Sequence, residues 1–335
     1  MCAESRETEQ LQERLAAAGA RIEPVLRELF PEGADEYLTE AVWYHLGTGG
    51  KRIRPAICLL TCEQLGGEPE KALHFAAAVE VLHNMLLIHD DIEDGDRVRR
   101  DRETVWVRYG MENAINVGDY MLGVAHEAVL ECPVTERQRV EMTRAFAAAY
   151  TDTCRGQAFD LNTRGTTDLT VEHYLKMVTL KTGRYMALGM LGGAIVADAE
   201  REVLAGVERL GERMGAAFQI RDDTIDLTIG KGRGGVVGND IREGKSSILY
   251  AHALREAPPE DAERLSATMR KPREETTEAD VEWVRTLYER VGSLEFAHDE
   301  ADRLVREAYE IIAAIPVADR DFLRQVTDYM VSRKK

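Results

Sequence analysis

The sequence predicts an all-α protein that forms one domain over residues 1–335. Helix-favouring Ala, Leu, Glu and Arg are abundant, whereas aromatic residues make up only 6% of the chain. Apolar residues recur every three or four positions, and no segment shows the strict alternation of a half-buried strand. The breaks between these periodic segments are short, so no linker divides the chain. A single large helical bundle is the expected architecture.

The individual helices follow from local patterns. Residues 72–89 are apolar on almost every side, which predicts a central buried helix. Residues 136–155 and 281–291 each carry apolar residues at helical spacing, and Thr277 with Asp280 forms a capping box before the second. The longest uncharged apolar run, Met186–Ala197, is shorter than the roughly 20 residues of a membrane span, so we expect no transmembrane segment. The predicted breaks between helices are Gly47–Gly50, Gly66–Pro69, Cys132–Pro133, Asn162–Thr167, Pro258–Pro259 and Lys271–Pro272.

Charge and cysteine content exclude several classes of protein. The net charge of −17 argues against a general nucleic-acid binder, because such proteins carry a basic surface. The five cysteines show neither disulfide nor zinc spacing, which is typical of a reducing compartment. The chain opens on charged residues and not on an apolar signal segment, so we expect a cytoplasmic protein.

Two acidic segments share one pattern. Asp90, Asp91 and Asp94, and likewise Asp222, Asp223 and Asp226, form Asp-Asp-x-x-Asp directly after an apolar helical run. Carboxylates four residues apart lie on the same helix face, where they repel each other unless a cation lies between them. Carboxylate oxygens with room for water suit Mg²⁺, which also binds substrate phosphates. The repeated pattern therefore predicts a magnesium site.

Basic residues accompany the acidic segments. Arg97, Arg99, Arg100 and Arg102 follow the first segment, and guanidinium groups bind phosphate oxygens in pairs. Upstream, Lys51 and Arg54 lie in Gly-Gly-Lys-Arg-Ile-Arg-Pro before a predicted helix, whose N-terminus favours an anion. Two acidic and two basic groups indicate two phosphorylated substrates.

These residues resemble the trans-isoprenyl diphosphate synthases of the polyprenyl synthetase family, and in particular its geranylgeranyl diphosphate synthases. The resemblance runs from about Gly47 to Leu249 and keeps the order of the family's motifs. Those motifs are Gly-Gly-Lys-Arg-Ile-Arg-Pro, His83, the first aspartate motif, Arg99-Arg100, Ala114–Asp119, Lys181-Thr182-Gly183, Phe218-Gln219, the second aspartate motif and Gly244-Lys245-Ser246. The resemblance implies the isoprenoid synthase fold, which is a helical bundle around a central cavity, and a homodimer.

The resemblance also implies a role for each matched residue. Asp90, Asp94 and Asp222 would hold Mg²⁺ against the diphosphate of an allylic substrate, supported by Asp91 and Asp226. The residues expected to contact that diphosphate are Arg99, Lys181 and Lys245, and those expected to hold isopentenyl diphosphate are Lys51, Arg54, His83 and Arg100. Thr182 and Gln219 would face the developing allylic cation. The implied reaction is a head-to-tail condensation that gives a trans-prenyl diphosphate, in which the released diphosphate takes the proton.

The residues before Asp90 predict the product length. In the resembled family, bulk one and two turns before the first aspartate stops the growing chain, and here Leu82, Met85 and Leu86 are of intermediate size. A medium-length product follows, geranylgeranyl diphosphate first, with farnesyl or a longer prenyl diphosphate as alternatives.

The sequence also suggests alternative functions, which it favours less. A cyclase of the same fold would use the aspartates without isopentenyl diphosphate, and a non-catalytic partner subunit would be expected to lose them. Gly244-Lys245-Ser246 is similar to the end of a nucleotide-binding phosphate loop, but no strand precedes it. His89-Asp90 also suggests a metal phosphohydrolase, which the dispersed histidines do not favour.

The chain departs from the resembled family at several positions. Asp101 and Glu103 replace a glycine and a proline after Arg99-Arg100, and Trp106 stands where a histidine is common. The glycine-rich stretch Gly230–Asn239 predicts a loop, which is either a flap that closes over substrate or an ordinary surface loop. Gly234-Gly235 lies there in place of a Gly-Lys pair, and Lys231 or Arg233 is expected to compensate.

Overall fold

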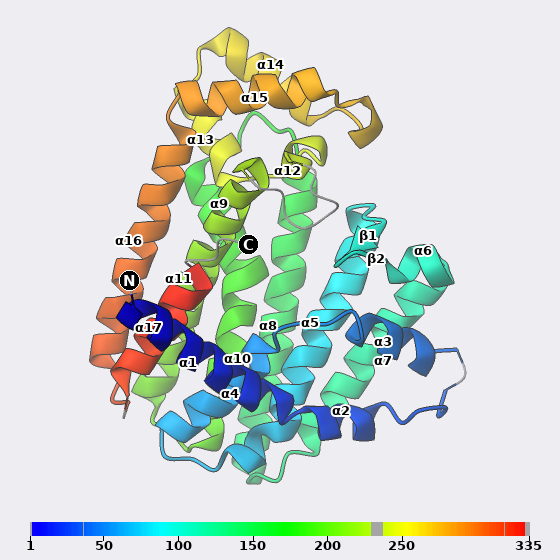
Figure 1. The fold of residues 1–335 in the computed structure, drawn as a ribbon, viewed down its shortest axis with the longest axis vertical. Coiled ribbons are helices and arrows are strands. Elements are labelled where there is room, and N and C mark those ends of the chain that lie inside the picture. Colours follow the sequence, from blue (N-terminus) through cyan, green and yellow to red (C-terminus); the bar gives the residue numbers. More distant parts are fainter. Residues whose placement is uncertain (1, 36, 229–236, 318, 332–335) are drawn as a thin grey trace. The chain divides into compact units, whose positions relative to one another are not determined.

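The computed structural model describes residues 2–35, 37–228, 237–317 and 319–331, with side chains from residue 8 onward. Its α-helices are α1 (Cys2–Ala20), α2 (Glu23–Leu29), α3 (Thr39–Leu46), α4 (Ile53–Gln64), α5 (Leu73–Glu93), α6 (Val105–Tyr109), α7 (Met111–Leu130), α8 (Glu136–Thr163), α9 (Val171–Val178), α10 (Arg184–Val196), α11 (Arg201–Thr228), α12 (Asn239–Arg242), α13 (Ile248–Glu256), α14 (Pro259–Met269), α15 (Glu278–Arg290), α16 (Ser293–Ala314) and α17 (Arg320–Val331) (Figure 1). Two 3₁₀ turns, η1 (Pro69–Ala72) and η3 (Arg273–Glu275), and one π-helical turn, η2 (Thr179–Gly183), complete the helices. The predicted all-α class is confirmed.

The chain divides into two compact units. Unit 1 comprises Met1–Tyr150, Met186–Glu208 and Ile312–Val326, and unit 2 comprises Thr151–Tyr185, Arg209–Ile311 and Thr327–Lys335. Each unit is discontinuous in sequence, so neither corresponds to one uninterrupted stretch of chain. The single domain over 1–335 and the central cavity expected from the sequence stay predictions.

Unit 1 is built around α5. This helix packs along α7 and α4, while α1 packs on α4 and α6 packs on α7 (Figure 1). Glycines bring some backbones very close together: a Cβ on Gly193 of α10 would lie 2.2 Å from the carbonyl oxygen of Cys58 in α4. Phe75, Val79, Leu82 and Met85 of α5 are fully buried, as expected for a central helix.

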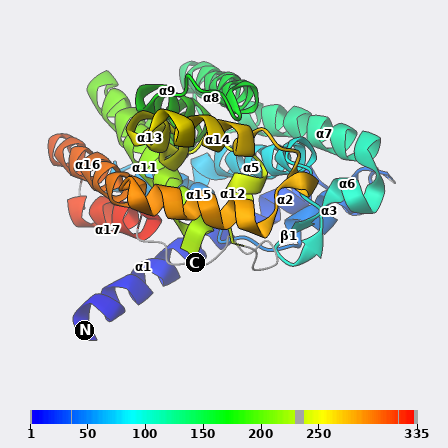
Figure 2. The same ribbon diagram turned by 90° about the horizontal axis from the view of Figure 1, so that it is seen from above.

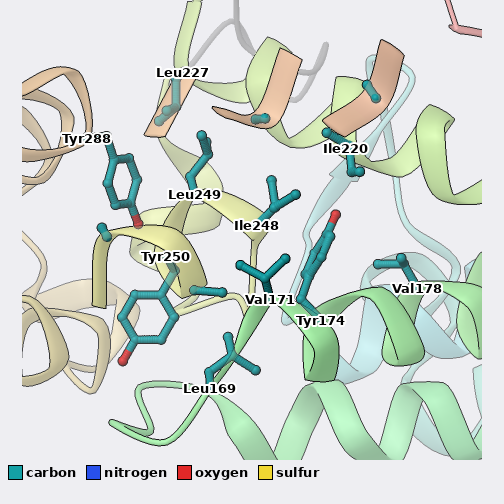
Figure 3. Close-up of a cluster of buried hydrophobic side chains, with 14 of the residues drawn as sticks. Leu169, Val171, Tyr174, Val178, Ile220, Leu227, Ile248, Leu249, Tyr250 and Tyr288 are labelled. Carbon is teal, nitrogen blue, oxygen red and sulfur yellow. The ribbon is translucent and has the colours of Figure 1, made fainter. Parts of the chain in front are cut away.

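Unit 2 has its own apolar core. Helices α9, α11, α13, α14, α15 and α16 supply it, and α14 and α15 lie side by side (Figures 1 and 2). Three tyrosines, Tyr174, Tyr250 and Tyr288, are its largest fully buried side chains (Figure 3). This core holds the elements that carry Lys181, Gln219 and Lys245.

Most local predictions are confirmed. Each of the six predicted breaks lies at a boundary between helices, although Asn162, Thr163 and Pro259 still belong to the adjoining α-helices and Pro69 begins η1. The Thr277–Asp280 capping box has both of its hydrogen bonds. Pro69–Glu93 is long and apolar enough to cross a membrane, with a mean hydropathy of 1.3, but 67% of its apolar window is buried inside the structure. Such burial is typical of a core helix, which agrees with the prediction for this segment.

One small sheet was not foreseen. Strands β1 (Val98–Arg99) and β2 (Arg102–Glu103) pair in an antiparallel hairpin after α5 (Figure 1). The turn residues Arg100 and Asp101 have φ angles of 52° and 61°, as a two-residue hairpin turn requires. Strands of two residues are too short to leave an alternating pattern in the sequence, which is why they were missed.

Candidate active site

The first aspartate motif lies at the C-terminal end of α5. Asp90 and Asp91 occupy the last turn, and Asp94 is the C-cap residue. The β-hairpin turns Arg99 back toward them: its Nε donates to Oδ1 of Asp91 at 2.6 Å, and its Nη2 lies 3.5 Å from Oδ2 of Asp90. Arg99 therefore partly neutralises Asp90, which was predicted to bind Mg²⁺, and Asp91, which was predicted to support it.

This arrangement fits a metal cation. Asp91 and Asp94 are buried, and the C-terminal end of a helix carries partial negative charge, so carboxylates there repel both each other and the helix dipole. Burial raises the pKa of Asp91 to about 7, although Arg99 opposes the rise. The donors are hard carboxylate oxygens, which suit Mg²⁺. Among the described residues, no three His, Cys, Asp or Glu side chains already converge on a metal-sized site.

Unit 1 also gathers the basic group predicted to hold isopentenyl diphosphate. Nη1 of Arg54, in the first turn of α4, lies 3.4 Å from Nε2 of His83 in α5. Burial, followed by the charge of Arg54, lowers the pKa of His83 well below its ordinary value, so the ring is neutral at pH 7. Arg100 donates to the carbonyl oxygen of Gly49 and approaches Oγ1 of Thr48 at 3.4 Å. Arg54, His83 and Arg100 thus share one electropositive neighbourhood.

A buried ion pair underlies that neighbourhood. Arg52, between Lys51 and Ile53, has a left-handed backbone with φ 47° and ψ 35°. Its Nη1 donates to Oε1 of Glu80 at 2.5 Å, and their side chains are 16% and 5% exposed. This pair holds the segment from which Lys51 and Arg54 project.

Unit 2 contains a small cavity of about 40 Å³. Eight of its ten lining residues have polar or charged side chains, and two of the predicted lysines take part. The lining residues are Asp160, Tyr174, Met177, Val178, Lys181, Gln219, Asp223, Lys245, Ser246 and Ser247. Lys181, Gln219 and Lys245 are therefore brought together, as the resemblance implied.

The π-helical turn η2 presents Lys181 and Thr182. Such turns are frequent at functional sites. Nζ of Lys181 donates to Oδ2 of Asp160 at 2.8 Å, and Oγ1 of Thr182 donates to Oε1 of Gln219 at 3.3 Å. Gly156 of α8 allows this approach, because a Cβ there would lie 2.4 Å from the backbone nitrogen of Lys181.

Lys245 lies among carboxylates. Its Nζ is 2.8 Å from Oε2 of Glu243 and 3.8 Å from Oδ1 of Asp240. The backbone nitrogen of Asp240 in turn donates to Oδ2 of fully buried Asp226 at 3.0 Å. Asp226 thus connects the second aspartate motif to the segment that carries Lys245, and its expected role in supporting Mg²⁺ stays a prediction.

Asp222 lies in α11 and is half-buried, one turn before Asp226. The first aspartate motif belongs to unit 1 and the second to unit 2. The joint magnesium set of Asp90, Asp94 and Asp222 stays a prediction.

The predicted chain-length residues lie on α5. Leu82 and Met85 are fully buried, and Leu86 is half-buried. Their role in product length stays a prediction.

Asp101 and Trp106, which depart from the family pattern, have local structural roles. Asp101 occupies the hairpin turn, and Nε1 of Trp106 donates to the carbonyl oxygen of Asp96 at 2.8 Å. The expected compensating residues Lys231 and Arg233, together with Gly234-Gly235, lie outside the described residues.

Sequence reasoning missed several of the residues that line the cavity. Asp160, Tyr174 and Asp223 line it, and the last was noted only as part of a motif. Asp160 offered a signal, since it is a lone acid beside apolar Phe159 and Leu161 in a predicted helix. Tyr174 offered none, because an apolar helix face commonly contains a tyrosine.

Comparison with known proteins shows the family of the chain. The family model described as polyprenyl synthetase matches residues 35–288. The short chain isoprenyl diphosphate synthase of Methanothermobacter thermautotrophicus is 34% identical over 92% of this chain and 94% of its own length. The crystal structure of geranylgeranyl pyrophosphate synthetase from Pyrococcus horikoshii is 31% identical, with a TM-score of 0.90 over 98% of this chain and 100% of that one. The crystal structure of polyprenyl synthase from Caulobacter crescentus, complexed with calcium and isoprenyl diphosphate, is 26% identical with a TM-score of 0.86 over 98% of both chains.

The resemblance found in the sequence is confirmed, and so is the isoprenoid synthase fold. The family match spans most of the chain, and the Methanothermobacter relative is similar over nearly its full length. The chain belongs to the polyprenyl synthetase family and is a prenyltransferase.

Proposed function

We propose that this prenyltransferase condenses isopentenyl diphosphate with an allylic diphosphate in the presence of Mg²⁺, and that its main product is geranylgeranyl diphosphate. One observation carries the proposal: the cavity of unit 2 gathers Lys181, Lys245 and Gln219, and Thr182 is hydrogen-bonded to Gln219. Two lysines that can bind a leaving diphosphate thus lie near the side-chain oxygens of Thr182 and Gln219, which can stabilise a carbocation. The names of the Pyrococcus and Caulobacter proteins support the same substrate class and a divalent metal.

The basic, polar and acidic residues of the site have different roles in the reaction. Lys181, Lys245 and Arg99 stabilise the diphosphate as negative charge develops on it during cleavage of the allylic carbon–oxygen bond. Lone pairs on Thr182 and Gln219 face the carbocation. Mg²⁺ at Asp90, Asp94 and Asp222 would act as a Lewis acid on the same leaving group.

The acceptor substrate is held by a separate set. Lys51, Arg54 and Arg100 bind the diphosphate of isopentenyl diphosphate, and neutral His83 adds a hydrogen bond without further charge. After the new carbon–carbon bond forms, the released diphosphate takes the proton. These roles favour extension over cyclisation, since a cyclase has no use for a second diphosphate site.

The proposed assembly is a homodimer in a reducing cytoplasm that does not bind nucleic acid. Cys58, Cys62 and Cys132 are buried and unpaired by disulfides, and burial raises the pKa of the Cys132 thiol to about 12. Such thiols are unreactive, which suits a reducing compartment. Light scattering on the purified chain measures the oligomeric state directly.

The deciding experiment offers the purified protein isopentenyl diphosphate and Mg²⁺ with dimethylallyl, geranyl or farnesyl diphosphate in turn. We expect a twenty-carbon diphosphate from each starter, and no product after a chelator removes the metal. Diphosphate release without elongation would indicate a cyclase or hydrolase, and no turnover with any starter would indicate a non-catalytic subunit. A fifteen-carbon or longer main product would correct the proposed chain length alone.

The size of the product is tested at α5. Met85→Ala removes a fully buried side chain one turn before the first aspartate motif, and we expect products longer than those of the natural protein. Product sizing by chromatography measures this, and an unchanged length distribution would show that other residues set the limit.

A further inference from the structure

Asp223 is the centre of a hydrogen-bonded chain in unit 2. The hydroxyl of Tyr174 donates to its Oδ2 at 2.7 Å, and Nε2 of Gln219 donates to its Oδ1 at 3.0 Å. At the other end, Oγ1 of Thr182 lies 3.3 Å from Oε1 of Gln219. Tyr174, Gln219 and Asp223 all line the cavity that Lys181 and Lys245 share.

The chemistry of the donors fixes the direction of this chain. A carboxylate only accepts hydrogen bonds, so the amide of Gln219 must turn its NH₂ group toward Asp223. Its carbonyl oxygen then faces Thr182, whose hydroxyl must donate. The hydroxyl oxygen of Thr182 and the second lone pair of the Gln219 carbonyl oxygen are then the negative ends of the two groups.

Tyr174 completes the arrangement. Its side chain is fully buried, and the ring lies in the apolar cluster near Val171 and Val178 with the hydroxyl pointing out of it (Figure 3). Burial and then the charge of Asp223 raise the pKa of Tyr174 well above its usual value, so the hydroxyl keeps the proton that it donates. Without this donor, Oδ2 of Asp223 would lose a partner, and the carboxylate could rotate away from Gln219.

We propose that Tyr174 and Asp223 are positioning residues that fix the amide of Gln219 with its oxygen toward the allylic cation. The inference rests on the proposed function, which places Gln219 and Thr182 beside the reacting carbon. In this proposal Tyr174 acts through its hydrogen bond to Asp223, which in turn orients Gln219. Tyr174 and Asp223, which are not among the proposed Mg²⁺ ligands, thereby contribute to the rate at which the allylic carbon–oxygen bond breaks.

The first test is Tyr174→Phe, which keeps the ring and removes the hydroxyl. We expect kcat to fall roughly threefold to tenfold, the effect of one buried hydrogen bond, while the KM for isopentenyl diphosphate stays within about twofold. The matched control is Tyr250→Phe, because that hydroxyl is also in the core of unit 2 and donates to the carbonyl oxygen of Thr166 at 2.6 Å. The control should lower the unfolding temperature similarly and leave kcat unchanged.

The second test is a double-mutant cycle with Gln219→Leu. Once the amide is gone, Tyr174 has nothing to orient, so adding Tyr174→Phe to Gln219→Leu should not lower kcat further. A merely structural tyrosine would lower kcat by the same factor in both backgrounds, which would overturn the proposal. An unchanged kcat in Tyr174→Phe alone would also overturn it.

Failure of this inference is separable from failure of the proposed function. If Gln219→Leu and Thr182→Val both leave kcat unchanged, the proposed roles of those residues are wrong and the positioning role falls with them. If both lower kcat while Tyr174→Phe does not, only the positioning role is wrong. Should Tyr174→Phe fail to fold, Asp223→Asn asks the same question, since an asparagine can pair with either face of the amide and should lower kcat more than tenfold.

Discussion

Glu80→Gln tests how the isopentenyl diphosphate site is held. The change keeps the size of the side chain but removes the charge opposite Arg52, whose guanidinium is 16% exposed. Removing one partner of a buried ion pair costs about 3–5 kcal/mol, and the retained amide oxygen and partial exposure of Arg52 reduce this to about 2 kcal/mol. Urea unfolding followed by circular dichroism should show that loss. The KM for isopentenyl diphosphate should rise severalfold, because Lys51 and Arg54 flank the left-handed residue that Glu80 holds.

The control is Glu63→Gln, which removes the partner of Arg14 in an exposed pair 3.8 Å apart. Surface pairs contribute about 0–1 kcal/mol, so this variant should resemble the natural protein. A Glu80→Gln variant with the same unfolding curve as Glu63→Gln would refute the reasoning, since it would show that the charge of Arg52 is satisfied by water. A raised KM for the allylic substrate alone would show that the pair supports a different site.

Two further perturbations address packing and pH. Gly156→Ala should lower kcat and raise the KM for the allylic substrate, because its Cβ would lie 2.4 Å from the backbone nitrogen of Lys181. The control is Gly123→Ala, which should be neutral or stabilising because a Cβ there would have nothing within 4 Å. Steady-state kinetics and thermal melting compare the two variants, and equal behaviour would contradict the close packing at Gly156. Burial, followed by nearby arginines, lowers the pKa of His45 from 6.5 to about 3, so its contribution to stability is present above pH 6.5 and is lost as the pH falls toward 3. His45→Leu should therefore reduce the loss of stability between pH 7 and pH 5 by about 2 kcal/mol, measured by urea unfolding, and an unchanged pH dependence would show that folding does not lower the pKa of His45.

Local features of the fold were predictable because neighbouring residues determine them. The capping box of Thr277 and Asp280 involves residues three apart, and its hydrogen bonds form within one turn of helix. The same reasoning placed Asp90 and Asp94 at one helix end. The glycine and proline breaks were equally readable, since they act on the backbone of their own residues.

Contacts between distant residues were not predictable. Tyr174 and Asp223 are 49 residues apart, and Arg52 and Glu80 are 28 apart, so neither pair leaves a periodic signal. The π-helical turn at Thr179–Gly183 was also invisible, because its sequence is compatible with an ordinary α-helix. These features depend on how closely other helices approach, as Gly156 does at Lys181.

The sequence by itself determined the helical class, the positions of both acidic helix ends and the basic residues that accompany them. Each of these depends on side-chain type and spacing within a few turns of helix. Only the tertiary structure decided which partner each charged or polar group has: Asp160 for Lys181, Glu80 for Arg52, and Tyr174 with Gln219 for Asp223. The physical reason is that a buried polar group must be paired, and the partner that pairs with it is chosen by packing and not by distance along the chain.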